Sequence, residues 1–477
     1  MNILEEFERG ILSNLGWPLW AMRSIEALVG AVIIVFLIQF VIVQEEKKSE
    51  ALAGGKYFWN SEFRIFQFQY LSVYLIIMLA DWLQGTNMYT LYSSYEVNVG
   101  TLFITGFLSS ALFGTFLGVY VDRWGRKFGC ILFCVLEIVI NLLEHIPSMP
   151  VLMFGRILGG LSTSLLFSAF ESWYNTEHRK RKYPEELMAS TFAISSWGNG
   201  VVAIAAGIFA QLASDVAGDI GPFQLAILLT AMTLILILFW TENYGKTEEG
   251  VDSIMQSIRS STNKILKSPS MLYLGLSQSF FEGAVFTFVF MWVPSMQKVN
   301  SGQSLPTGLV FSCFMLCMTI GGMLFGILLP IFPGGAEGLC VFVYAVAACA
   351  MAVPIFKFEF WWVFCAFLVL ETMVGMFNSC GATLRSQYYP EEMQSSIMTV
   401  FRLPLNLLVV VGTKLTDSAN DIPSLQFVFG VVVSMHLIAM LLQILLSINS
   451  EKLKRQRAES VDYSCFSCFP DTKSKSD

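Results

Sequence analysis

Long apolar segments alternate with short polar ones along most of the chain. A helix needs about 20 consecutive apolar residues to cross the hydrocarbon core of a bilayer. Thirteen segments come within a few residues of this length or exceed it, which predicts an all-α, polytopic membrane protein. They span residues 20–43, 66–92, 98–120, 128–146, 150–173, 188–212, 222–241, 271–293, 305–330, 337–355, 359–382, 394–415 and 424–447.

Lysine and arginine concentrate in alternate polar segments. Cytoplasmic loops of membrane proteins carry an excess of these residues, so we expect the cation-rich segments on the cytoplasmic side. The alternation agrees with the span count, and it predicts a cytoplasmic C-terminus and, with thirteen spans, an N-terminus outside. The cation-rich segments are 44–65, 121–127, 174–187, 242–270 and the tail after residue 450, and the cation-free loops are 93–97, 213–221 and 416–423.

The composition agrees with this class and excludes others. The 477 residues are 55% hydrophobic and 14% charged, whereas soluble domains carry roughly 25% charged residues. Most cysteines lie in apolar segments and the three histidines are scattered, so we expect no metal site and no cofactor. The lone Cys465-x-x-Cys468 pair in the tail is weak evidence for lipidation or metal binding. No phosphate-binding loop occurs, which argues against ATP-driven pumping, and no nucleophile–base pair occurs, so we do not expect an enzyme. We also expect no nucleic-acid partner.

A short internal repeat divides the chain into two halves. The tetrapeptide Tyr-Pro-Glu-Glu occurs at residues 183–186 and again at 389–392, each time in a cation-rich or polar loop just before a span. Two six-helix halves joined by a polar connector fit transporters built from parallel repeats. The expected parts are an N-terminal segment 1–61 with an extra transmembrane helix, bundles at 62–245 and 271–449, a cytoplasmic connector 246–270 that is partly amphipathic, and a cytoplasmic tail 450–477.

Charged side chains inside spans are costly, so they are functional candidates. Glu282 and Glu371 lie about 16 Å, and Arg402 about 12 Å, from the cytoplasmic ends of their spans at a rise of 1.5 Å per residue. These three could share one layer of the C-terminal half. Asp81 and Arg156 lie closer to the outer face of the N-terminal half and could meet if their helices are neighbours. Structural ion pairs between helices are the alternative.

The span that Arg156 opens carries small residues as well as a charge. Gly160, Ser164 and Ser168 recur at a spacing of four, which lets another helix approach closely, and packing alone explains them. The same span offers hydroxyl donors beneath Arg156. A cation with hydroxyl donors is what a tetrahedral oxyanion requires.

One charged turn resembles a known motif. The pattern G-x-x-x-D-R-x-G-R-K at residues 118–127 resembles the loop between the second and third core helices of the major facilitator superfamily. The resemblance implies that the turn braces the closure of the N-terminal bundle. The matching place in the second half, residues 330–335, lacks a cation. The residues implied as a conformational gate are Gly118, Asp122, Arg123, Gly125 and Arg126.

Three further segments resemble the eukaryotic molybdate-anion transporter branch of this superfamily. They are residues 81–85, the run 155–174 and residues 401–405, and the resemblance extends roughly over residues 62–447. It implies two six-helix bundles around a central cavity, and we interpret the first apolar segment, 20–43, as an extra helix in front of this core. The resemblance also implies secondary import of molybdate across the plasma membrane by alternating access.

The expected site combines the intramembrane charges with this resemblance. Arg156 and Arg402 would supply positive charge to a small oxyanion, with the lipid bilayer as the other partner and a single chain as the transport unit. Transport of another small organic or inorganic solute, or a receptor or scaffold role without transport, stays open. The remaining expected substrate-binding residues are Ser162, Thr163 and Asn378, and the residues expected to balance the cations or carry a coupling proton are Asp81, Glu282 and Glu371.

Overall fold

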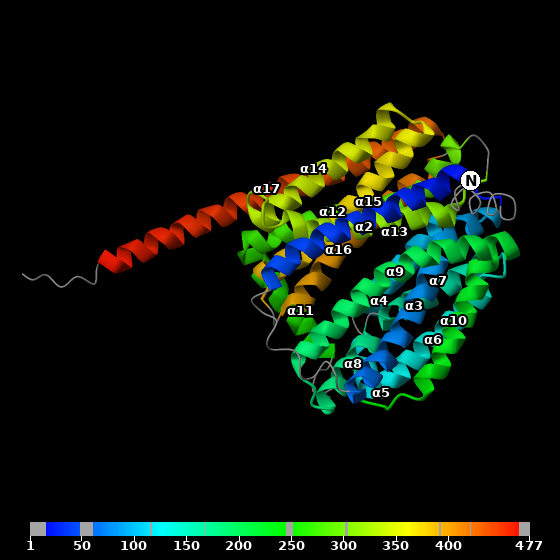
Figure 1. Cartoon of the computed structure of the whole chain (residues 1–477), viewed down its shortest axis with the longest axis horizontal. Coiled ribbons are helices and arrows are strands. Elements are labelled where there is room, and N and C mark those ends of the chain that lie inside the picture. Colours follow the sequence, from blue (N-terminus) through cyan, green and yellow to red (C-terminus); the bar gives the residue numbers. More distant parts are fainter. Residues whose placement is uncertain are drawn as a thin grey trace, which may run out of the picture.

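The structure is a computed structural model that describes residues 16–47, 61–114, 117–166, 168–244, 251–300, 304–390, 393–419 and 421–466. These residues form helices and short connections, and no β-strand occurs among them. In a bilayer every backbone N–H and C=O must find a partner within the protein, and a helix provides these partners within one segment. The predicted all-α class is confirmed, and the helices form two bundles (Figure 1).

The N-terminal bundle has six core spans, two of which are broken into a pair of helices. The second span comprises α4 and α5, and the fourth comprises α7 and α8. The elements are α3 (Ser61–Ser94), α4 (Val99–Gly114), α5 (Leu117–Trp124), α6 (Arg126–Leu143), α7 (Met149–Leu166), α8 (Ala169–Lys180), α9 (Glu185–Ala217), the 3₁₀-helix η1 (Gly218–Ile220) and α10 (Gly221–Leu238).

The C-terminal bundle follows the connector helix, which packs against α16. The two Tyr-Pro-Glu-Glu copies lie at equivalent places, since the first runs into the first turn of α9 at Glu185, and Tyr389 and Pro390 of the second follow α15. The elements are α2 (Leu19–Lys47) ahead of both bundles, the connector α11 (Val251–Lys267), and α12 (Pro269–Val299), α13 (Thr307–Leu328), α14 (Gly335–Phe356), α15 (Phe360–Tyr388), α16 (Gln394–Asp417) and α17 (Ile422–Phe466).

Each of the thirteen expected spans corresponds to one or two helices among the described residues. In the described part of the chain, 10 helical segments are long and apolar enough to cross a membrane. The count is lower because Ser190–Leu238 holds two spans joined by η1, and Val99–Phe113 is shorter. The third span that the count leaves out is α6, whose 18 residues include the charged Arg126, Lys127 and Glu137.

Several helices extend beyond the expected span ends. α5 ends at Trp124 and α6 begins at Arg126, so the charged turn is a one-residue break at Gly125 rather than a loop. α15 continues to Tyr388, six residues past the expected end at 382, and therefore includes Arg385. α17 continues to Phe466, so much of the expected tail prolongs this helix away from the bundles (Figure 1).

The two ends of the bundles differ in charge. We call one end the cation-rich end, since it carries the Gly125 break and the connection between α8 and α9 with its neighbouring lysines and arginines. The opposite end carries the connection at 95–98 and η1, which have no lysine or arginine, and we call it the cation-poor end.

The bundles are joined at the cation-poor end. Asn98 Nδ2 and the backbone N of Gly100 donate to the Asp417 carboxylate, at 2.8 and 3.1 Å. The backbone N of Gly308 donates to Gln211 Oε1 at 3.2 Å. These contacts connect α4 with α16 and α9 with α13, which lie in different bundles. The structure is therefore closed at this end.

The extra helix α2 also contacts both bundles. It packs along α13 (Figure 1). Just before it begins, Trp17 Nε1 donates to Asp215 Oδ2 at the end of α9, at 2.6 Å. Trp20 packs edge-on against Phe360 and Phe364 of α15, with ring centroids 4.8 and 5.5 Å away. The expected N-terminal helix is confirmed, and its first turns tie the bundles together at the cation-poor end.

Closure here depends on glycines. A Cβ on Gly308 would lie 2.3 Å from the Gly207 carbonyl oxygen, so Gly308→Val is expected to hold the bundles apart at the cation-poor end. The substitution Asn87→Cys provides the labelling site, because Asn87 is 2% exposed and lies next to Thr307 in this interface. We expect a water-soluble maleimide to label the introduced cysteine several-fold faster in the Gly308→Val background.

The matched control for this experiment is Gly430→Val, because a Cβ on Gly430 has no atom within 4 Å. Equal labelling rates in the Gly308→Val and Gly430→Val backgrounds would show that the glycine contact does not hold this end closed.

Candidate functional site

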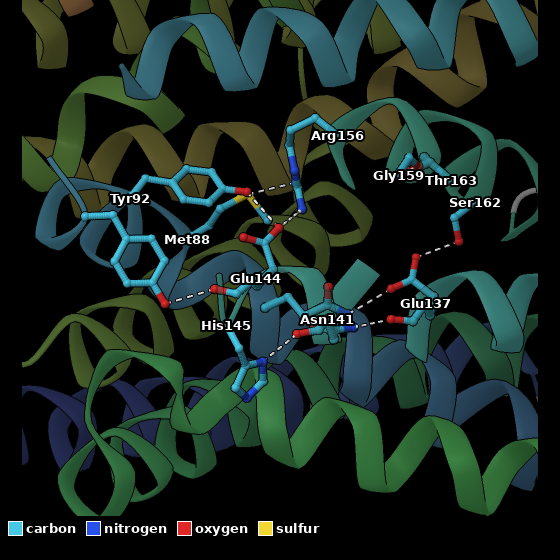
Figure 2. Close-up of polar contacts among 12 residues, drawn as sticks. Met88, Tyr92, Glu137, Asn141, Glu144, His145, Arg156, Gly159, Ser162 and Thr163 are labelled. Atoms are coloured by element: carbon cyan, nitrogen blue, oxygen red, sulfur yellow. Dashed lines mark hydrogen bonds and ion pairs between the residues drawn. The ribbon is translucent and has the colours of Figure 1, made fainter. Parts of the chain in front are cut away.

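Arg156 is neutralised inside the N-terminal bundle (Figure 2). Its Nη2 lies 2.5 Å from Glu144 Oε1, and the two side chains are 11% and 1% exposed. Tyr92 donates its hydroxyl to the same carboxylate oxygen at 2.8 Å, and Met88 Sδ accepts from Arg156 Nη1 at 3.2 Å. The structure therefore pairs Arg156 with Glu144, just after α6, and not with Asp81 as its sequence position had allowed.

A second polar layer lies next to this pair (Figure 2). Glu137 Oε1 accepts from Ser162 Oγ at 2.6 Å, and its Oε2 accepts from Gln84 Nε2 at 3.1 Å. Ser162 is fully buried, so its hydroxyl is out of reach of a solute and donates to Glu137 instead. Thr163 is exposed, and its hydroxyl donates to the Gly159 carbonyl at 2.9 Å. Of the two expected hydroxyl donors on α7, the structure leaves Thr163 accessible.

Asn378 and Arg402 are exposed on the inner sides of their helices. Val369, 41% exposed, marks the outer side of α15. Asn378 comes nine residues later, about two and a half turns, and so points to the opposite side. On α16, Leu407 is 65% exposed on the outer side, and Arg402 precedes it by five residues, about 1.4 turns. Both polar side chains therefore open away from the lipid-facing surface.

The N-terminal bundle has a similar inner opening. Along α3, Asp81 and Gly85 are exposed, whereas every other residue from 69 to 92 is buried or half-buried. A lipid-facing side would be exposed along its whole length, so this single open turn indicates an internal space. On α7, Thr163 comes nine residues after the outward-facing Phe154, which again places it on the opposite side. Since α3 contacts α12 and α13, we place these openings between the bundles.

The C-terminal bundle holds a cluster of two arginines and one glutamate. Glu282 on α12 is half-buried, and Arg385 and Arg402 both interact with it electrostatically. Arg385 Nη1 donates to Gln278 Oε1 at 3.0 Å, and Gln278 Nε2 donates to the Gly381 carbonyl at 3.3 Å. The sequence placed Glu282 and Arg402 in one layer, and the structure adds Arg385 to them.

Glu371 does not belong to this cluster. It is 5% exposed, and its Oε2 has no hydrogen-bond partner among the described residues. It lies fourteen residues from Arg385 along the same helix, about 21 Å away. The sequence estimate had measured its depth from residue 382, but α15 continues to Tyr388, which moves Glu371 further from the helix end.

The charged turn is anchored within its own bundle. The Glu242 carboxylate, just after α10, accepts from the backbone N of Lys127 and Phe128 at 2.8 and 3.1 Å. These are free donors at the first turn of α6, where the helix dipole favours a negative charge. Gly125 has φ 115°, and a Cβ there would lie 2.6 Å from Glu242 Cδ, so this break requires glycine.

Of the other expected gate residues, the structure describes the side chains of Arg126 and Arg123. Arg126 Nη1 donates to the Ser172 carbonyl at 3.1 Å and to Thr176 Oγ1, both on α8, and Arg123 is exposed. The surroundings of Gly118 and the side chain of Asp122 lie outside the described part of the chain.

Comparisons with known proteins identify the family. A family described as sugar transporters with twelve transmembrane helices matches residues 53–361. The molybdate-anion transporter of Xenopus laevis is 33% identical over 378 residues, covering 76% of this chain and 82% of that protein. The chain is a member of the major facilitator superfamily. The molybdate-anion transporter of Danio rerio is 30% identical over 398 residues, covering 74% and 79% of the two chains.

Solved structures share the fold of this transporter at low sequence identity. The nucleoside transporter NupG has a TM-score of 0.65 and 11% identity, covering 80% of this chain and 99% of that one. A bacterial homologue of the human lysosomal transporter Spinster, inward-facing and unoccupied, has a TM-score of 0.59 and 13% identity, covering 80% and 96%. The expected major facilitator fold is confirmed, and the chain is a multi-pass membrane transporter and not an enzyme.

Sequence reasoning missed three charged residues of this transporter. Glu144 lay two residues inside an expected span end, and Arg385 and Glu242 lay just beyond one, where charges are ordinary. One signal was available for Arg385. Pro390 disfavours the helical conformation in the residue before it, so α15 could be expected to continue almost to Tyr389.

The buried Arg156–Glu144 pair makes a stability prediction. Removing one partner of a buried ion pair typically costs about 3–5 kcal/mol, because it leaves the other charge unpaired. We expect Glu144→Gln to lower the free energy of unfolding of the purified transporter by this order, and Arg156→Met in the same chain to restore part of it. Glu359→Gln, at an exposed position, serves as control. Additive single effects in the double variant would show that the pair is not coupled.

Proposed function

We propose that this transporter imports molybdate across the plasma membrane by alternating access. Two kinds of support converge on this substrate. Relatives at 30–33% identity over most of their length are named molybdate-anion transporters. The inner sides of the helices also carry the positive charge and hydrogen-bond donors that a tetrahedral dianion needs to offset its desolvation.

The observation that carries the proposal is the contrast between two arginines. Arg156 is held by a buried glutamate, whereas Arg402 is exposed on the inner side of α16. Arg402 is therefore the available cation of the pair expected from the sequence. Asn378, exposed on the inner side of its helix, would complete the donor set, and Thr163 would join it by turning its hydroxyl from the Gly159 carbonyl to the anion.

The remaining charged residues have more limited proposed roles. Arg156, with Ser162 in the adjacent layer, would shape the N-terminal wall of the cavity rather than touch the anion. Glu282 would balance the arginines of the C-terminal bundle. Asp81, open to the cavity, and Glu371, buried without a cation, would be the candidates for a coupling proton, because each can change charge without breaking an ion pair described here.

The orientation follows from the distribution of cations. Lysine and arginine mark the cytoplasmic side, so we propose that the cation-rich end faces the cytoplasm, with the C-terminus inside and the N-terminus outside. The closed cation-poor end then faces outward, and the structure represents an inward-facing state. The charged turn, anchored by Glu242 and Arg126, would keep the cytoplasmic ends of the N-terminal bundle rigid as the bundles rock. A single chain would be the transport unit.

The test is molybdate uptake into cells that express the chain. We expect uptake above that of cells lacking it, and we expect Arg402→Gln to raise the half-saturating concentration roughly ten- to hundredfold, the equivalent of one lost hydrogen-bonded charge. Arg402→Lys should be intermediate, since it keeps the charge but loses the planar fork.

The control for Arg402 is Lys414→Gln, an exposed cation on the same helix near the cation-poor end. It should leave the half-saturating concentration unchanged. Wild-type cells that take up no more molybdate than cells without the chain would contradict the proposal. Saturable uptake of a neutral solute that Arg402→Gln leaves unchanged would instead favour transport of a sugar-like substrate.

A further inference from the structure

Arg385 is a cation held in a defined position near the inner end of α15. Its Nη1 donates to Gln278 Oε1 at 3.0 Å, and Gln278 is itself 6% exposed and tied to the Gly381 carbonyl. Gly381 leaves the room for this arrangement, since a Cβ there would lie 3.2 Å from Arg385 Nη1. A guanidinium has about five N–H donors, and this hydrogen bond uses one of them. Arg385 is therefore oriented by the protein while it keeps donors to offer.

Arg385 lies on the same side of α15 as the accessible Asn378. Seven residues separate them, about two full turns, so their side chains lie above one another along the helix. The exposed Ala382 lies between them on this side. Arg385 is half-buried, whereas Asn378 is exposed on the inner side. A solute that reaches Asn378 from the cation-rich end passes Arg385 first.

Arg385 and Arg402 are brought to the same glutamate from different helices. Ser279 Oγ on α12 donates to the Phe401 carbonyl at 3.1 Å, so the backbone that carries Arg402 lies beside the turn of α12 that carries Gln278. Glu282 lies one turn beyond Gln278, and both arginines act on it electrostatically. Two arginines that share a partially dry site repel each other, and Glu282 reduces this repulsion while the site is empty. A dianion bound between the arginines would reduce their repulsion further, because it carries two negative charges. The cluster therefore carries two positive charges and one negative charge, with α12, α15 and α16 as its three walls.

We propose that Arg385, positioned by Gln278, is the second arginine of the anion site and acts together with Arg402. This inference rests on the proposed transport of a tetrahedral dianion, and it locates the positive charge in the C-terminal bundle. Arg156, the sequence-based candidate for the second arginine, keeps its charge paired with Glu144. With Glu282 the cluster keeps a net positive charge, and each arginine would face one of the two negative charges of molybdate, so losing one arginine should reduce the preference for a dianion over a monoanion of the same shape.

The experiment measures anion binding to the purified full chain by calorimetric titration. The probes are molybdate and perrhenate, tetrahedral oxyanions of similar size that carry two negative charges and one. We expect Arg385→Gln to weaken molybdate binding at least tenfold and perrhenate binding less, so that the preference for the dianion falls. Arg385→Lys should weaken molybdate binding to an intermediate degree, because the charge remains and the planar fork is lost.

Gln278→Met tests the positioning role without changing the charge. It should weaken molybdate binding several-fold while the preference over perrhenate stays near that of the wild type. Ser386→Ala is the control, since Ser386 is the exposed neighbour of Arg385 and its hydroxyl turns back to the Thr383 carbonyl. If Arg385→Gln does not fold, Arg385→Lys and Gln278→Met carry the test.

The outcomes separate this inference from the proposed function. Wild-type affinity and dianion preference in the folded Arg385 variants, with binding lost in Arg402→Gln, would overturn the role of Arg385 and leave molybdate transport standing. A wild-type chain that binds no molybdate and imports none would overturn both.

Discussion

A charge that a helix carries into the membrane must meet an opposite charge or water, and this constraint sorts the arginines of the transporter. Arg156 meets Glu144 in a buried pair, supported by Tyr92. Arg402 is exposed on the inner side of α16. The first arrangement stabilises a bundle, and the second leaves a cation available to a solute. The location of the proposed site in the C-terminal bundle depends on this difference.

The same constraint relates the closed end of the molecule to its proposed cavity. The contacts between bundles gather at the cation-poor end, where Asp417 and Gln211 accept hydrogen bonds across the interface. Polar side chains exposed on inner helix sides lie further along the helices. A polar cavity between helices is tolerated because water or a polar solute fills it. Alternating access then requires the contacts at the closed end to break as new ones form at the other, and α2 must release one bundle or move with both.

The sequence predicted the fold well because apolar length and cation placement are properties of whole segments. Helical spans, two halves and an extra leading helix could all be read from them. The site was harder to predict, because pairing depends on where a helix ends to within one turn. Arg385 was placed outside a helix that includes it, and Glu371 was placed too near the end of its helix for the same reason. Glu144 could not be recognised as the partner of Arg156, because a glutamate near a span end is usually solvated.

Locating the bound anion would test directly whether the site lies in the C-terminal bundle. Crystals of the full chain grown with molybdate, with data collected at the molybdenum absorption edge, would reveal the metal atom by its anomalous scattering. We expect one strong peak between α12, α15 and α16, with the oxyanion within hydrogen-bond distance of Arg402 and Arg385. A peak beside Arg156 in the N-terminal bundle, with the Arg402 and Arg385 side chains free of the anion, would contradict this expectation.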